Sequence, residues 1–432
     1  MKLRFKFDYS VFVLLLMSVI IIEANYWTLL PKLRINNDLL RMIWAVLMVV
    51  VLIVSHFHIK AVRAEFFWIV YLGVVLLFRN AQLLRGEYKN TLLIVLCVIS
   101  MLVCTYKPEW TKTVPVLLLI IGLPNLVATL LFYVNNKLYL RFIAATYKTY
   151  QAGTALGAYG YKAGIAGHYS HNGTYLIILM LIFFSILFSM KLRGWKKAVV
   201  IVAAVAALFA VFLTTKRAHL LFGGVAILLT YYIANRSSGS KKLMRTIIIG
   251  AIVIVAAELV IDAVPELSNT VDRLTSAGTD SASVNRLTMW RYALSHFGEN
   301  ALFGHGWCSF SYNQSIAYVD GAYAGAHNVY IQLLYEVGII GFVIAVLALA
   351  ITLVTTCKNL IAIKKANSDY LFAATVSLSI QIFFIIYGFT GNFLFDQMFL
   401  FYAVSVAISF AISANMPAVL NSTGNRLQKG AA

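Results

Sequence analysis

The chain has 432 residues, of which 61% are hydrophobic and 12% are charged. A water-soluble protein of this size could not remain dispersed with that balance, so the composition indicates a membrane protein. The formal net charge of +19 could suggest a nucleic-acid partner. Lys and Arg are instead scattered among short connections, so we predict no nucleic-acid binding. The cysteines have no metal-type spacing and predict neither a disulfide framework nor a metal site: Cys97, Cys104, Cys308 and Cys357.

Apolar runs recur along the whole chain, and each can cross a hydrocarbon layer of roughly 30 Å at about 1.5 Å per residue. These runs are apolar on every side, which favours helices over the alternating strands of a barrel. We therefore predict an all-α polytopic membrane protein with about twelve transmembrane helices in a single integral membrane domain, 1–432. The predicted spans are 9–24, 38–56, 65–79, 90–105, 113–134, 174–190, 198–215, 218–235, 244–262, 328–355, 370–388 and 394–412. No small-residue cleavage site follows the first run, which indicates a retained helix.

The positive residues predict the orientation of these spans. If the N-terminus is cytoplasmic, more than half of the 35 Lys and Arg residues fall in cytoplasmic segments, most of them short. Positive residues resist translocation, so this asymmetry predicts that both termini are cytoplasmic.

Two long connections then face outward, 135–173 and 263–327. Long loops between packed helices are usually functional or disordered, and the many aromatic residues in these two argue against disorder. The stretch "RLTMWRYALSHF" in the second loop predicts a short amphipathic helix along the membrane surface. The larger outer loop is therefore the expected place for chemistry.

Lys216 and Arg217, in "LTTKRAHLLFGG", stand between two apolar runs at the outer boundary. Such a pair can simply mark a tight turn, with the charged ends reaching into water. The functional alternative is an anion clamp, because Arg217 begins an inward-running helix whose N-terminal dipole also favours phosphate.

The large outer loop contributes Arg286 and Arg291 in "VNRLTMWRYAL", and the next span begins with His327 and Asn328. Each arginine taken alone is an ordinary solvated side chain. His327 could be a structural residue at a helix start, or a general base, since its ordinary pKa lies near 6.5.

Three other polar residues carry weaker signals. Glu336 lies more than two helical turns beyond His327, so we interpret it as a packing carboxylate. His168 and His171 are spaced like metal ligands, but no carboxylate stands close to complete a site. No nucleotide-binding, metalloprotease or nucleophile-elbow motif occurs at a structurally sensible place, so we predict no metal and no cofactor.

Taken in order, "TTKRAHLLFGG", "RLTMWRYALSHFGENALFGHGW" and "AHNVYIQLLYEVGIIGF" resemble the O-antigen ligase and polymerase superfamily of bacterial envelope glycan enzymes. The resemblance covers about 210–342, while the first 200 residues agree only in hydropathy. It implies that Arg217 and Arg286 bind a pyrophosphate and that His327 is the base, with Arg291 and Asn328 as further substrate-binding residues. The family usually has Ser before the first Arg. Lys216 takes that place here, which changes the expected clamp.

The resemblance also implies a metal-independent, inverting glycosyltransferase in the bacterial inner membrane. Its partners would be an undecaprenyl-pyrophosphate-linked oligosaccharide donor, an acceptor glycan, membrane lipid and a chain-length regulator. We expect a polymerase that extends a surface polysaccharide. The alternatives are a ligase that transfers the finished glycan to a separate acceptor, and a lipid or solute transporter or flippase. Transport is the less favoured class, because transporters bind near the bilayer midplane and often have broken helices in related halves.

Overall fold

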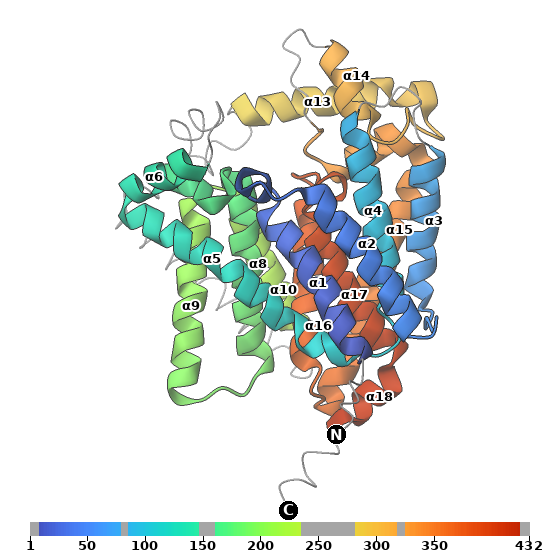
Figure 1. The fold of residues 1–432 in the computed structure, drawn as a ribbon. Coiled ribbons are helices and arrows are strands. Elements are labelled where there is room, and N and C mark those ends of the chain that lie inside the picture. Colours follow the sequence, from blue (N-terminus) through green and yellow to red (C-terminus); the bar gives the residue numbers. More distant parts are fainter. Residues whose placement is uncertain (1–7, 79–84, 147–159, 235–280, 318–324, 424–432) are drawn as a thin grey trace, which may run out of the picture.

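The computed structural model of the chain describes residues 8–78, 85–146, 160–234, 281–317 and 325–423. Helices make up the secondary-structure elements of these residues, mostly as one upright bundle (Figure 1). The long helices are α1 (Tyr9–Tyr26), α2 (Asn37–Val54), α3 (Arg63–Leu77), α4 (Arg85–Val103), α5 (Val114–Val134), α8 (Tyr169–Ser189), α9 (Gly194–Leu213), α10 (Arg217–Ala234), α15 (Val329–Ala366), α16 (Leu371–Tyr387) and α17 (Phe399–Ala414). The shorter ones are α6 (Asn136–Thr146), α13 (Ser281–Phe297), α14 (Ser309–Ala317) and α18 (Met416–Leu420).

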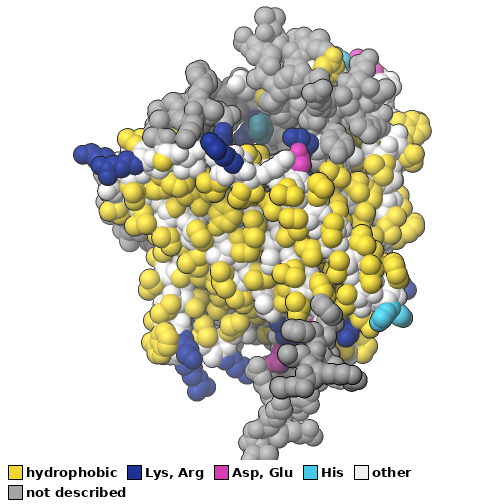
Figure 2. Space-filling view, in the orientation of Figure 1, with side chains coloured by type: hydrophobic (Ala, Val, Ile, Leu, Met, Phe, Trp, Pro, Cys, Tyr) yellow, Lys and Arg dark blue, Asp and Glu magenta, His cyan; other side chains and the backbone are white. Residues whose placement is uncertain are grey.

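The predicted spans correspond to these helices. Every one of them coincides with a described helix except 244–262, which lies outside the described residues. Within the described part of the chain, seven helices are long and apolar enough to cross a membrane, and α16 and α17 are shorter apolar helices. On the face shown in Figure 2, hydrophobic side chains cover the middle of the molecule, with Lys and Arg side chains above and below them. The chain is therefore a polytopic, all-helical membrane protein, as predicted.

The centre of the bundle consists of α16 and α17, which are buried along almost their whole length. Serine and threonine side chains join them and α15. Ser377 donates a hydrogen bond to the carbonyl of Ser405 at 2.6 Å, and the hydroxyls of Thr356 and Ser409 lie 2.7 Å apart. In a membrane, where the hydrophobic effect does not drive helices together, such bonds help to fix their packing.

The two ends of the bundle differ. We call one the α13 end, because α13 lies across it at the top of Figure 1, and the opposite one the α18 end. The stretch "RLTMWRYALSHF" falls within α13, which confirms the helix predicted there. At the α18 end, the Tyr9 hydroxyl donates to Val103 and the Asn415 amide to Thr105, so the start of α1 and the ends of α4 and α17 lie together.

The segment after α13 packs against a break in α15. Gly338 has φ +63° and interrupts α15, and Gly304 on the facing segment has φ +72°. A β-carbon on either glycine would lie 2.4 Å from backbone atoms of the other segment. The amides of His305 and Gly306 donate to the carbonyls of Tyr335 and Glu336, which the break leaves without helical partners.

Candidate functional site at the α13 end

Lys216 stands in the turn between α9 and α10, directly before the first residue of α10. Its ammonium nitrogen lies 4.3 Å from the ring centroid of Tyr169, the first residue of α8. His168 caps α8 by accepting a hydrogen bond from the Ser170 amide. Burial, followed by the Lys216 charge, lowers the pKa of His168 to about 4. The start of α8 and the turn before α10 thus form one half of the site.

The other half comes from α13 and the start of α15. Trp290 of α13 donates its indole N–H to the Ala326 carbonyl at 2.8 Å, and the Ala326 amide donates to the Gln332 side chain at 3.0 Å. These bonds attach α13 to the residue directly before His327. His327 itself has φ +50°, an uncommon conformation for a residue other than glycine.

His327 connects the two halves electrostatically. Its imidazole is exposed at the surface, yet the protein around its other sides lowers its pKa to about 4. Removal from water is the largest cause, and the charges of Arg286 and Lys216 follow in that order. Both cations therefore lie within electrostatic range of His327, although Lys216 comes from the turn before α10 and Arg286 from α13. At neutral pH the imidazole is uncharged and able to accept a proton.

Two residues that the sequence analysis missed belong to the same region. Tyr387, the last residue of α16, lies within electrostatic range of Asp396 and Arg286, and its ring centroid is 4.9 Å from that of His219. Asp396 is half-buried before α17, and desolvation raises its pKa to about 7, although the Met398 amide donates to its carboxylate at 2.8 Å. A carboxyl group near the start of the predicted span 394–412 was the available signal, but no motif distinguished it.

Three other predicted residues have the following positions. Arg217 is half-buried as the first residue of α10. Arg291 is exposed, and five residues beyond Arg286 it projects about 140° further around α13. The Asn328 side chain caps α15 by accepting from the amides of Tyr330 and Ile331. Lys216, Arg286 and His327 are therefore the predicted residues that the structure brings together most clearly.

Glu336 has the structural role predicted for it. Its carboxylate is fully buried and accepts hydrogen bonds from the amides of Cys308 and Phe310 and from the Gln332 side chain, at 2.6, 3.2 and 2.9 Å. It therefore holds the segment after α13 against α15. The described residues contain no group of three or more His, Cys, Asp or Glu side chains placed to hold a metal.

In this arrangement the cations can bind an anionic group, and the uncharged imidazole can accept a proton. Electrostatic binding of that kind is strong where protein replaces water around the charges. A pocket lined by Trp27, Asp38 and Lys89 among others lies beside this cluster and does not contain it.

No curated protein matches the chain, but one segment of it matches a protein family. Residues 202–346, which carry Lys216, Arg217, Arg286 and His327, match the family described as O-Antigen ligase. The resemblance predicted from the three sequence segments is thereby confirmed, and residues 202–346 form an O-antigen ligase family domain within a multi-pass membrane protein.

Proposed function

We propose that this protein polymerises lipid-linked oligosaccharide units into a surface polysaccharide at the α13 end of the bundle. The observation that carries the proposal is that Lys216 in the turn before α10 and Arg286 of α13 both lie within electrostatic range of the imidazole of His327. Two cations beside a proton acceptor suit a reaction in which a diphosphate leaves and a hydroxyl attacks.

In the proposed reaction, the bond between the anomeric carbon and the diphosphate oxygen breaks, and undecaprenyl pyrophosphate leaves with the bonding electrons. The acceptor hydroxyl forms the new glycosidic bond, and its proton passes to His327. Attack from the side opposite the leaving group inverts the anomeric carbon. Lys216 and Arg286 stabilise the negative charge that grows on the diphosphate, and Arg217 is positioned on α10 to assist them.

The low pKa of His327 is consistent with this order of events. Removal from water is the largest cause of the low pKa, and two neighbouring positive charges disfavour the imidazolium further. A bound diphosphate offsets those charges and returns the pKa of His327 toward its ordinary value. The base therefore becomes stronger when the donor is in place.

The proposed reaction requires one orientation of the helix bundle in the membrane. The α13 end would face the extracytoplasmic side of the bacterial inner membrane, and the α18 end the cytoplasm. A cysteine at exposed Glu299 should then react with a membrane-impermeant maleimide in intact cells, after Cys→Ser replacement of the native cysteines. Labelling only after the membrane is opened would reverse the orientation.

A ligase is the second candidate, because the matching family is described as O-Antigen ligase. The experiment that separates the two supplies the purified protein with a lipid-linked repeat unit alone. A ladder of products supports a polymerase, and product only after addition of a separate acceptor supports a ligase. Movement of labelled lipid across vesicles without a new glycosidic bond would instead support transport and refute both enzymes.

A further inference from the structure

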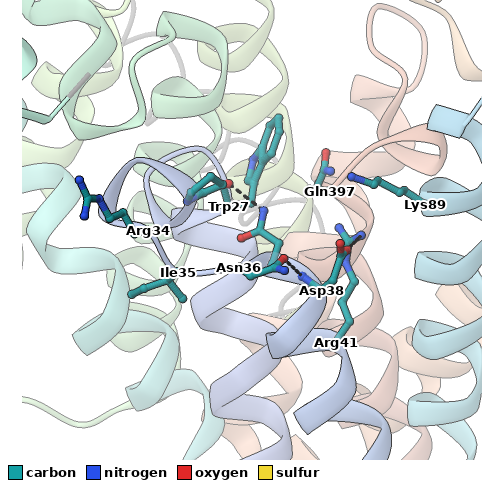
Figure 3. Close-up of a pocket in the computed structure, with 10 residues that line it drawn as sticks. Trp27, Arg34, Ile35, Asn36, Asp38, Arg41, Lys89 and Gln397 are labelled. Carbon is teal, nitrogen blue, oxygen red and sulfur yellow. Dashed lines mark hydrogen bonds and ion pairs between the residues drawn. The ribbon is translucent and has the colours of Figure 1, made fainter. Parts of the chain in front are cut away.

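A pocket of about 500 Å³ opens at the α13 end, and His327 is not among the residues that line it. Its walls come from the connection between α1 and α2, the start of α2, Lys89 of α4 and Gln397 (Figure 3). We call it the α1–α2 pocket. The residues that line it are Trp27, Pro31, Arg34, Ile35, Asn36, Asn37, Asp38, Arg41, Lys89 and Gln397.

The lining has an excess of positive charge, because it holds three cations and one carboxylate. Arg41 is held in place by Glu23 at 2.7 Å and lies 3.6 Å from Asp38. Arg34 and Lys89 are exposed and stand on opposite sides of the pocket in Figure 3. The charge balance favours an anionic ligand over a neutral sugar.

The helix that contributes Asp38 and Arg41 to the pocket also carries an exposed apolar face. In this face of α2, Leu39, Met42 and Val46 are 52%, 66% and 61% exposed. A ligand with an anionic head in the pocket could therefore lay its apolar tail along α2. Phosphate-bearing lipids have this combination of groups, whereas a free anion would use only the pocket.

The pocket is also adjacent to the candidate site. Trp27 packs edge-on against His171, with ring centroids 4.9 Å apart, and His171 lies 5.1 Å from His168. His168 is the residue whose pKa the Lys216 charge helps to lower. Two cationic regions thus lie at the same end of the bundle, separated by one layer of aromatic and imidazole rings.

We propose that the α1–α2 pocket binds the phosphate group of a second lipid-linked glycan, the acceptor, while Lys216 and Arg286 bind the diphosphate of the donor. This inference rests on the proposed polymerase, in which both reacting molecules carry a lipid diphosphate. Two separate anion sites allow both molecules to be held at once, so that the sugar hydroxyl of one can reach the anomeric carbon of the other.

The test is the number of undecaprenyl pyrophosphate molecules bound by the full chain, measured by native mass spectrometry after release from nanodiscs. We expect two per protein, and one in the double variant R34Q/K89Q, whose pocket affinity should fall at least about tenfold. K216Q/R286Q should also bind one. K137Q, which changes an exposed lysine of α6 outside the pocket, should still bind two.

The outcomes separate the two proposals. One molecule bound to the wild type, unchanged by R34Q/K89Q, overturns the second site and leaves the proposed function standing. Loss of one molecule in R34Q/K89Q but none in K216Q/R286Q supports the pocket and contradicts the proposed donor site. If R34Q/K89Q loses phosphatidylglycerol and keeps both undecaprenyl pyrophosphate molecules, the pocket holds ordinary phospholipid and the inference is wrong.

Discussion

Trp290 donates its indole N–H to the backbone carbonyl of Ala326 over 2.8 Å, and this bond joins the helix that carries Arg286 to the residue before His327. Phe at position 290 would keep most of the packing and lose the bond. We expect W290F to lower kcat about tenfold, because Arg286 and His327 are no longer held at a fixed distance. The acid limb of the pH–rate profile should also shift. A variant that loses only stability would keep the wild-type profile.

Arg286 and Lys216 should be needed for turnover and not for folding. Because each would stabilise charge that grows on the leaving diphosphate, R286A and K216A should lower kcat about 10²- to 10³-fold. R286K should recover little activity, since lysine cannot offer two parallel N–H donors. Arg141 of α6 is exposed at the same end of the bundle, and R141A is the matched control. Equal activity of R286A and R141A would refute the role of Arg286.

The pH dependence should report His327. The donor-free pKa of about 4 means that the imidazole is already uncharged above about pH 5. We therefore expect protonation of His327 to have no effect on kcat/KM between pH 5 and 7. Below pH 5, kcat/KM should fall as His327 becomes protonated. The acid limb of kcat should lie at higher pH than the acid limb of kcat/KM, because bound diphosphate raises the pKa of His327.

The variant K216Q tests whether the charge of Lys216 acts on His327. Removing one positive charge beside His327 raises the pKa of the free imidazole, so the acid limb of kcat/KM should move to higher pH. Residual activity of the variant is sufficient for this measurement. A limb that stays in place would show that the Lys216 charge does not act on the base.

Asp396 should make stability depend on pH. Its folded pKa of about 7 lies above the ordinary value for a carboxyl group, so the folded protein holds a proton that the unfolded chain has lost between about pH 4 and 7. The contribution to stability is therefore full at low pH and lost as pH rises through 7. We expect the Tm in detergent to fall from pH 5 to pH 8, and to fall less in D396N. The same decrease in both proteins would assign it to other groups.

The contact between Gly304 and Gly338 should tolerate no side chain. Both residues have positive φ, and an added methyl group would overlap the opposing backbone. G338A should therefore lower the free energy of unfolding by roughly 2 to 4 kcal/mol or prevent folding. Gly224 of α10 has open space where a β-carbon would lie, and G224A should be neutral or slightly stabilising. Similar melting temperatures for G338A and G224A would contradict the described packing.

The sequence predicted the positions of the long helices well because length and hydropathy are sufficient to identify an apolar helix. It did not predict the break at Gly338, since the apolar run continues through it and the backbone groups it frees are bonded by a distant segment. Arg286 and His327 were found through motif resemblance. Tyr387 and Asp396 were missed because the approach of Tyr387 to Asp396 and Arg286 depends on how the helices pack, and spacing in the sequence does not reveal it.

The most direct test of the account is a cryo-electron microscopy structure of the protein in nanodiscs with undecaprenyl pyrophosphate. We predict density for a diphosphate within hydrogen-bonding distance of Lys216 and Arg286, with His327 beside it and open to the approach of an acceptor. A diphosphate bound only in the α1–α2 pocket, or Arg286 and Lys216 directed into separate cavities, would contradict the proposed site.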